Sequence, residues 1–144
     1  MNVKIRKVRA DGKIPAYGSA GAAGADLYAC LERPVMLMPG ETRPIHTGIA
    51  LEIPEGYVGL VYARSGMALK KGLAPANKVG VIDSDYRGEI IVALHNHGAM
   101  TQAIEPGERV AQIVFTPCMQ AAFEEADELS DTQRGSGGFG STGQ

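Results

Sequence analysis

The chain has 144 residues, a formal net charge of −2 and a pI near 5.9. This length suits one domain with at most a short appendage, and the acidic balance argues against duplex nucleic acid, which calls for a basic protein face. No stretch approaches the roughly 18 consecutive apolar residues of a membrane helix, and the start, MNVKIRKVRA, is charged and alternating, unlike a signal peptide. We therefore expect a cytoplasmic protein that binds neither nucleic acid nor membranes.

Short runs rich in Val, Ile and Tyr, bounded by turn residues, dominate the chain. The clearest are VKIRKV (3–8), RPIHTGIALEI (43–53), GYVGLVYA (56–63), GEIIVALHN (88–96) and ERVAQIVF (108–115). MPGE at 38–41 and EPGE at 105–108 place Pro and then Gly at the centre of a turn, as a type II turn requires. Many short strands joined by such turns predict an all-β domain, which could be a sandwich, a jelly roll or a barrel.

One segment interrupts the strand pattern. ARSGMALKKGL (63–73) offers Ser65 as an N-cap, followed by helix-forming residues and by Gly72 as a stop, which predicts a helix of about two turns. The free N–H groups at its N-terminus, beside Arg64 and Ser65, would form a local anion site in a protein without net positive charge. A helical connector with a capping serine would explain the same residues.

The stretch NKVGVIDSDYRGEIIV (77–92) brings polar residues between two strand-like runs. We predict that SDYRG is the loop of a β-hairpin between VGVI and EIIVAL, with Gly88 relieving the backbone. Asp83 would then stand at the end of the first strand. An aspartate at a turn often caps the backbone, so the loop alone does not establish catalysis. AGADLYAC (23–30) is equally ambiguous, because Asp26 could simply neutralise an arginine.

The cysteines and histidines give little support to a metal or redox site. Cys30 and Cys118 lack C-x-x-C spacing, and two isolated thiols make no disulfide framework, so we expect buried free thiols. His95 and His97 share one face at the end of a strand, but the pattern offers neither a third metal ligand nor a ββα context. We interpret them, and likewise His46, as structural residues.

The chain ends in RGSGGFGSTGQ (134–144), where Gly135, Gly137 and Gly140 match the G-x-G-x-x-G spacing of dinucleotide-binding loops. Such a loop must open a helix inside a βαβ unit, but only four residues follow Gly140, and no lysine follows to make a Walker A loop. Composition alone indicates a flexible end. The arginine, the phenylalanine and the hydroxyl residues are unusual in a plain spacer.

One explanation covers the separate islands around Asp26, Arg64–Gly66, Asp83 and the glycine-rich end. In order along the chain stand AGADLYA, ARSGMA, GVIDSDYRGE, ERVAQIVF and RGSGGFGSTG. Together they resemble the five motifs of the homotrimeric deoxyuridine triphosphatases, over about residues 21–143. The resemblance implies that residues 1–126 form an all-β jelly roll or distorted β-barrel with one short helix. It also implies a flexible arm at 127–144 that completes a neighbouring active site in a homotrimer.

The same resemblance implies hydrolysis of dUTP to dUMP and pyrophosphate, which limits uracil incorporation into DNA and supplies dUMP for thymidylate synthesis. Asp83 would be the general base that activates a water for attack on the α-phosphorus. Because a carboxylate is a weak base, most of the rate must come from positioning and charge stabilisation. Arg64, Ser65 and Gly66 would hold the α and β phosphates. Mg²⁺ would be bound mainly by substrate phosphates and water, with few or no direct protein ligands.

The resemblance also assigns residues to the base, the sugar and the triphosphate. The uracil edge would be read by the backbone of Val81, Ile82, Asp83 and Ile91, with the Asn77 side chain. A cytosine would leave such groups unpaired, at a cost of the order of 1–3 kcal/mol per buried group. Tyr86 would lie against the deoxyribose, where a ribose 2′-hydroxyl would collide with its ring. Gln112 would reach a phosphate, and Arg109 would pair with Asp26 behind the site.

In the arm, Arg134 would meet the γ-phosphate and Phe139 would stack over the uracil, with further contacts from Gly138, Gly140, Ser141 and Thr142. Ala63 stands where many relatives have proline before the arginine of the second motif, but this change removes no functional group. Two alternatives remain open. A dCTP deaminase shares the fold, although the intact GVIDSDYRGE and glycine-rich end favour the pyrophosphatase, and a jelly-roll module could bind nucleotide or protein without catalysis.

Overall fold

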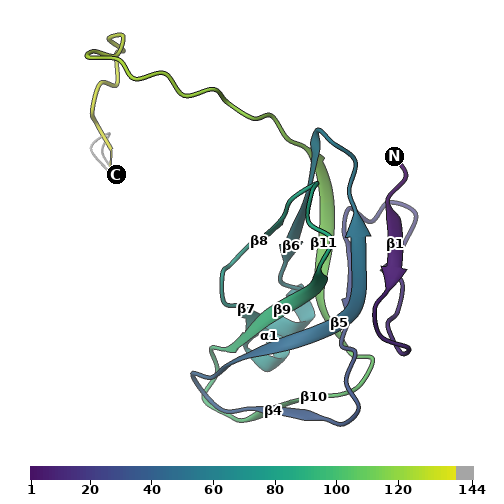
Figure 1. The fold of residues 1–144 in the computed structure, drawn as a ribbon. Helices are drawn as coiled ribbons and strands as arrows, with labels where there is room; N and C mark the ends of the chain where they lie inside the picture. Colours follow the sequence, from purple (N-terminus) through teal and green to yellow (C-terminus); the bar gives the residue numbers. More distant parts are fainter. Residues whose placement is uncertain (139–144) are drawn as a thin grey trace.

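The computed structural model describes residues 1–138 as antiparallel β-sheets and one short helix (Figure 1). A four-stranded sheet has the order β1-β5-β9-β7, a five-stranded sheet the order β2-β3-β11-β6-β8, and β10 pairs with β4. The elements are β1 (Lys4–Lys7), β2 (Ala16–Tyr17), β3 (Ala25–Tyr28), β4 (Val35–Leu37), β5 (Thr42–Glu52), β6 (Tyr57–Tyr62), α1 (Ser65–Lys71), β7 (Leu73–Pro75), β8 (Gly80–Ile82), β9 (Glu89–Asn96), β10 (Gln102–Ile104) and β11 (Arg109–Pro117).

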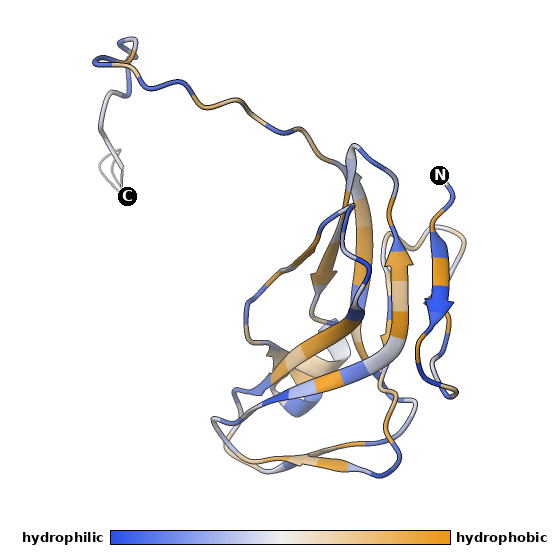
Figure 2. Cartoon of the chain, viewed as in Figure 1, coloured by the Kyte–Doolittle hydropathy of each residue, from blue (hydrophilic) through white to orange (hydrophobic). Residues whose placement is uncertain are grey.

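The apolar core draws its side chains from both large sheets. On β9, Ile90, Val92 and Leu94 are buried while the residues between them are exposed or half-buried. Figure 2 shows an alternation of hydrophilic and hydrophobic positions along β1, whereas most of β9 is apolar. Leu27 and Ile113 contribute from the five-stranded sheet. Each such side chain stabilises the fold by about 1.5–3 kcal/mol relative to exposure.

The expected all-β class is confirmed, as a jelly roll whose sheets are not closed into a barrel. Within residues 1–138, β1 and β7 are the edges of one large sheet and β2 and β8 the edges of the other, so the sheets do not close into a barrel. Closure requires the edge strands to pair with each other. The two large sheets instead hold together through the shared core.

The predicted strands and turns are present. The five strand-like runs form β1, β5, β6, β9 and β11. Gly40 and Gly107 have φ values of 73° and 75°, and the N–H groups of Glu41 and Glu108 close their turns at 3.0 Å. AGADLYAC contains β3, for which no strand was predicted, because β3 is buried on both faces and therefore shows no alternation.

The predicted helix is α1, although it begins differently from the prediction. Ser65 is already helical, and the N-cap residue is Arg64, with φ −92° and ψ 135° and no side-chain capping hydrogen bond. Arg64 takes this extended conformation while its side chain binds Asp26. Gly72 ends the helix as expected, with φ 66° and its N–H donating to Ala68 at 3.1 Å. Among residues 1–138, no helix is long or apolar enough to cross a membrane.

The predicted β-hairpin around SDYRG is wrong. β8 pairs with β6 in the five-stranded sheet, whereas β9 pairs with β5 and β7 in the four-stranded sheet. Residues 83–88, which we call the β8–β9 loop, therefore cross from one sheet to the other. Each strand finds its ladder partner far away in the sequence, and this tertiary pairing overrides the short-range turn signal.

The last strand ends at Pro117, and residues 118–138 contain neither helix nor strand. They lead away from the sheets (Figure 1), and the side chains of Met119, Phe123 and Leu129 are 95%, 98% and 89% exposed. The division into a domain at 1–126 and an arm at 127–144 stays a prediction. The predicted site residues Phe139, Gly140, Ser141 and Thr142 lie outside the described residues.

Candidate active site

A buried carboxylate on β3 binds two arginines. Asp26 is only 8% exposed. Its Oδ1 accepts from Arg64 Nε at 2.6 Å, and its Oδ2 accepts from Arg109 Nη1 at 3.2 Å. The Arg109 contact was expected, whereas the sequence did not show that Arg64 would share the same carboxylate. Because Asp26 takes Nε of Arg64, it fixes the direction in which the terminal nitrogens of that guanidinium point.

Gln112 lies beside Asp26, at the centre of the five-stranded sheet. It lies on β11 between its register partners Asp26 on β3 and Tyr62 on β6. Its Nε2 donates to the carbonyl of Ala63 at 2.9 Å, and a Cβ on Gly24 would lie 2.5 Å from its Oε1. Gln112 therefore supports the backbone that leads into α1, and its expected phosphate contact stays a prediction.

These contacts bring together what we call the arginine group, made of Asp26, Arg64, Ser65, Gly66, Arg109 and Gln112. Ser65 and Gly66 are exposed at the start of α1, and a Cβ on Gly66 would meet no atom within 4 Å. The first turn of α1 thus opens to solvent beside the Arg64 guanidinium. Backbone N–H groups and a positioned arginine in this arrangement can bind an anion.

The β8–β9 loop forms a second group, with Asp83 at its start. Asp83 is exposed, and within residues 1–138 its carboxylate makes no hydrogen bond, so its oxygens remain available to a water. Tyr86 folds back over the loop: its N–H donates to Asp83 O at 3.2 Å and its hydroxyl donates to Glu89 O at 3.0 Å. A side chain at Gly88 would collide with the Tyr86 hydroxyl and ring, so a larger residue there would displace Tyr86 from this position.

The residues expected to read uracil lie on the two strands that flank this loop. Val81 on β8 and Ile91 on β9 are 61% and 45% exposed. β8 is an edge strand, so among the described strands its outer backbone groups have no ladder partner. Asn77 is exposed in the connection before β8. Open main-chain donors and acceptors therefore exist where base recognition was predicted.

The strand register separates Asp83 from the arginine group. Ile82 pairs with Gly59 on the antiparallel strand β6, which places Asp83 level with Val58. Arg64 follows Val58 by six residues, and at about 3.3 Å per residue this corresponds to roughly 20 Å. One chain therefore does not bring the predicted base and the predicted phosphate-binding residues to one place.

Comparison with known proteins decides the family. Residues 10–143 match the family model described as dUTPase. The chain belongs to the dUTPase family. It is 52% identical to the deoxyuridine 5′-triphosphate nucleotidohydrolase of Desulfitobacterium hafniense (strain DSM 10664 / DCB-2), covering 99% of this chain and 97% of that one. It is 55% identical to the Chlamydia pneumoniae protein of the same name, with 92% of each chain covered.

Solved dUTPase structures share the fold. The Staphylococcus bacteriophage 80alpha dUTPase with dUPNHPP has a TM-score of 0.90 at 28% identity, covering 99% of each chain. A mutant dUTPase from phage phi11 of S. aureus, solved to show the coordination of a structural Mg(II) ion, has a TM-score of 0.80 at 26% identity, covering 89% of this chain and 98% of that one. The family suggested by the five ordered motifs is therefore confirmed.

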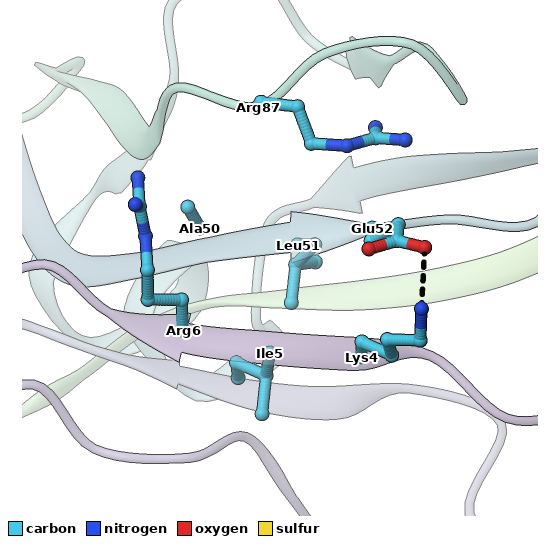
Figure 3. Close-up of a pocket in the computed structure, with 7 residues that line it drawn as sticks. All are labelled: Lys4, Ile5, Arg6, Ala50, Leu51, Glu52 and Arg87. Atoms are coloured by element: carbon cyan, nitrogen blue, oxygen red, sulfur yellow. Dashed lines mark hydrogen bonds and ion pairs between the residues drawn. The ribbon is translucent and has the colours of Figure 1, made fainter.

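An open groove of about 320 Å³ lies beside the β8–β9 loop of this dUTPase (Figure 3). Its lining residues are Lys4, Ile5, Arg6, Ala50, Leu51, Glu52 and Arg87. Lys4 Nζ and Glu52 Oε1 are joined at 2.9 Å in its wall. None of the predicted substrate-binding residues lines it, so we do not assign it to the substrate.

The histidines at the end of β9 do not complete a metal cage. Within residues 1–138, no three His, Cys, Asp or Glu side chains are grouped to hold a metal ion. The rings of His95 and His97 meet edge to face, 4.3 Å apart, and His95 Nδ1 lies 2.8 Å from the Thr42 hydroxyl. Desolvation, together with the charges of His95 and Lys78, lowers the pKa of His97, which favours its neutral form.

Sequence reasoning missed two contacts of this dUTPase. The first is the hydrogen bond from Gln112 to the Ala63 carbonyl. One sequence feature could have indicated it: a polar residue stands inside the apolar run VAQIV, and a half-buried amide needs a hydrogen-bond partner. Glu89 received no role, although it stands inside the GVIDSDYRGE motif. No sequence pattern identifies its partners, because they lie on β5 and on the segment after β1.

Proposed function

We propose that this dUTPase hydrolyses dUTP to dUMP and pyrophosphate, with Asp83 as the general base and the arginine group as the phosphate site. The observation that carries the proposal is that one chain holds both an open carboxylate on the β8–β9 loop and a fixed arginine beside an open helix start, and matches the family model over residues 10–143. Each group supplies what the other lacks for phosphoryl chemistry.

The arginine group would stabilise the negative charge of the triphosphate. Asp26 binds Nε of Arg64, and within residues 1–138 the terminal nitrogens of Arg64 make no other hydrogen bond. They can therefore donate to α- and β-phosphate oxygens, together with the N–H groups of Ser65 and Gly66. Because these donors are held in place before substrate arrives, little reorganisation is needed as charge develops in the transition state.

Asp83 would activate the attacking water. Its carboxylate accepts a proton from the water as the water oxygen bonds to the α-phosphorus and the bond to the α,β-bridging oxygen breaks, with pyrophosphate leaving. The proton passes from Asp83 to bulk solvent afterwards. The exposure of Asp83 and its lack of a partner within residues 1–138 support this role. Tyr86, over the same loop, would exclude a ribose 2′-hydroxyl.

The active form would be a homotrimer in which each site uses more than one chain. The separation of roughly 20 Å between Asp83 and Arg64 along β6 supports this, because a neighbouring copy must supply one of the two groups. The arm at 127–144, with Arg134 and Gly138 and the residues beyond, would close over a neighbouring site and exclude water.

Mixing two inactive variants tests the shared site. In a trimer assembled from Asp83→Asn and Arg64→Ala chains, a site between two chains can combine the intact Arg64 of one with the intact Asp83 of the other. Refolding an equal mixture should then restore about a quarter of the wild-type rate, by random assembly. Each variant refolded alone is the control. If the mixture stays as inactive as its parts, both groups act within one chain and the proposal fails.

Mg²⁺ would arrive with the triphosphate. Asp26 is already occupied by two arginines, and the described residues offer no group of three ligands, so the donor set suits an ion held by phosphate oxygens and water. The ion would neutralise part of the triphosphate charge. We place the protein in the cytoplasm, in keeping with its two free cysteines, Cys30 and Cys118.

A substrate panel separates the candidate functions. The purified chain is mixed with dUTP, dCTP or UTP in the presence of Mg²⁺, and both pyrophosphate and ammonia are measured. We expect pyrophosphate from dUTP and far less from the other two. Ammonia released from dCTP would identify a deaminase, and binding without turnover would identify a non-catalytic module.

A further inference from the structure

The strand pair β5–β9 contains an irregularity at the point where the β8–β9 loop ends. His46 pairs with Ile91 and Ala50 pairs with Glu89, so β5 uses four residue steps where β9 uses two. Gly48 stands in this bulge with φ 72°, and a Cβ there would lie 2.7 Å from Cys30 Sγ. The bulge is therefore tightly packed, and its backbone N–H needs a partner other than the ladder.

The Glu89 carboxylate provides that partner. Its Oε1 accepts from Gly48 N at 2.8 Å and from Arg9 Nε at 3.0 Å. Its Oε2 lies 2.8 Å from His46 Nδ1. Glu89 is 16% exposed, in contrast to the 46% of Glu52 in the surface pair with Lys4. Hydrogen bonds to a partly buried carboxylate are stronger than those of an exposed ion pair.

His46 contacts both of the charged groups in this cluster through one atom. Its Nδ1 lies 2.8 Å from Glu89 Oε2 and 2.9 Å from Arg9 Nη2. A protonated Nδ1 donates to Glu89, whereas an unprotonated Nδ1 accepts from Arg9, and it cannot do both at once. In either state Glu89 keeps the N–H groups of Gly48 and Arg9 as donors. The grip on the bulge therefore does not depend on the state of His46.

The backbone of Glu89 connects this grip to the β8–β9 loop. Glu89 is the first residue after the loop, and its carbonyl accepts the Tyr86 hydroxyl at 3.0 Å. At the other end, three register pairs to β6 hold β8. The loop thus has two anchors, and Glu89 makes the one next to Tyr86.

We propose that Glu89 is a positioning residue for dUTP hydrolysis: by binding the Gly48 bulge, it fixes the end of the loop that carries Asp83 and Tyr86. The inference rests on the function proposed above. It predicts that loss of the Glu89 carboxylate loosens the loop while the fold remains, because the core side chains beside it on β9, such as Ile90 and Val92, are untouched.

The test compares Glu89→Ala with the matched control Glu52→Ala in the full chain. Glu89→Ala leaves the Gly48 N–H without its acceptor, and we expect kcat/KM for dUTP to fall about tenfold, since small displacements of reacting groups have effects of this size. The preference for dUTP over UTP should fall as well, because Tyr86 loses its fixed support. Glu52→Ala should change neither value.

Conservative substitution distinguishes the hydrogen bond from the charge. Glu89→Gln keeps an oxygen that can accept from Gly48, so it should recover activity to within about threefold of the wild type. A Glu89→Gln variant as slow as Glu89→Ala would overturn the assignment to the Gly48 contact. If Glu89→Ala does not fold, Arg9→Gln removes one donor only, and it should lower the preference for dUTP in the same direction.

Amide hydrogen exchange gives a readout that does not depend on activity. Exchange at residues 84–88 should be faster in Glu89→Ala than in the wild type and in Glu52→Ala, while exchange in β11 stays unchanged. Equal exchange in all three proteins would refute the positioning role. A wild-type chain that does not turn over dUTP would instead refute the proposed function, and the exchange result would still decide whether Glu89 holds the loop.

Discussion

The two halves of the candidate site are held in different ways. The arginine group lies on three neighbouring strands, β3, β11 and β6, and it shares one buried carboxylate between two guanidinium groups. The β8–β9 loop is exposed and crosses between two sheets, with its anchors at its ends. The proposed phosphate site is thus built into a sheet, whereas the proposed general base and sugar contacts depend on a loop. Because of this difference, separate substitutions should impair the arginine group or the β8–β9 loop without affecting the other.

The largest expected effect is on the loop side. Asp83→Asn should preserve nucleotide affinity and lower kcat by about 10²–10⁴-fold, the usual contribution of general base catalysis. The exposed position of Asp83 implies no loss of stability. Binding of a non-hydrolysable dUTP analogue and steady-state turnover measure the two quantities. A rate within a few-fold of the wild type would exclude Asp83 as the base.

Truncation after Gln133 should have the second-largest effect. It removes Arg134 and everything that follows, and we expect most of the turnover to be lost while the fold and the trimer remain, because residues 118–138 contribute no strand to the sheets. Turnover and sedimentation of the truncated chain are the measurements. Normal activity would show that the end of the chain is only a spacer.

On the arginine side, Asp26→Asn should have a smaller effect on the rate and a measurable one on stability. Two guanidinium groups would lose their shared counter-charge, and after allowance for the half-exposed Arg109 we expect a loss of about 1–3 kcal/mol in the free energy of unfolding. Urea unfolding measures it, with Glu52→Gln, in the exposed pair with Lys4, as the control. Equal midpoints for both variants would contradict the buried pairing.

The smallest expected effect is on pH dependence. Against partial burial, which raises it, the hydrogen bonds from His46, Gly48 and Arg9 lower the pKa of Glu89. A lowered folded-state pKa stabilises the protein above the ordinary carboxylate pKa of about 4.3, and this contribution is lost as pH falls through the folded-state value.

Glu89→Gln should therefore reduce the difference between urea midpoints at pH 7 and in this acidic range. Besides these partners, the facing titratable groups are Cys30, whose thiol pKa is raised chiefly by burial, and Asp11. The Cys30 thiol, with its raised pKa, stays protonated throughout this acidic range, and Asp11→Asn serves as the check on the other carboxylate. An unchanged difference in Glu89→Gln would contradict the lowered pKa.

Periodicity and turn chemistry act over a few residues, and on that scale the sequence was sufficient. Alternation along residues 3–8 and the apolar run within residues 88–96 predicted strands, the Pro-Gly sequences at 38–41 and 105–108 predicted turns, and Gly72 predicted the end of the helix. The ordered motifs likewise indicated the family. Each of these signals depends on the conformation or the side-chain pattern of adjacent residues.

Only the tertiary structure decided how distant segments pair. It assigned β8 and β9 to different sheets where the sequence indicated a hairpin, placed Arg64 and Arg109 on the same carboxylate, and brought Glu89 to the Gly48 bulge. Ion pairs between residues 38 and 83 positions apart, and ladder partners on strands that are not adjacent in the sequence, leave no mark in local sequence patterns. The spacing of roughly 20 Å between Asp83 and Arg64 along β6 follows from that pairing, and it is the basis for proposing a site shared between chains.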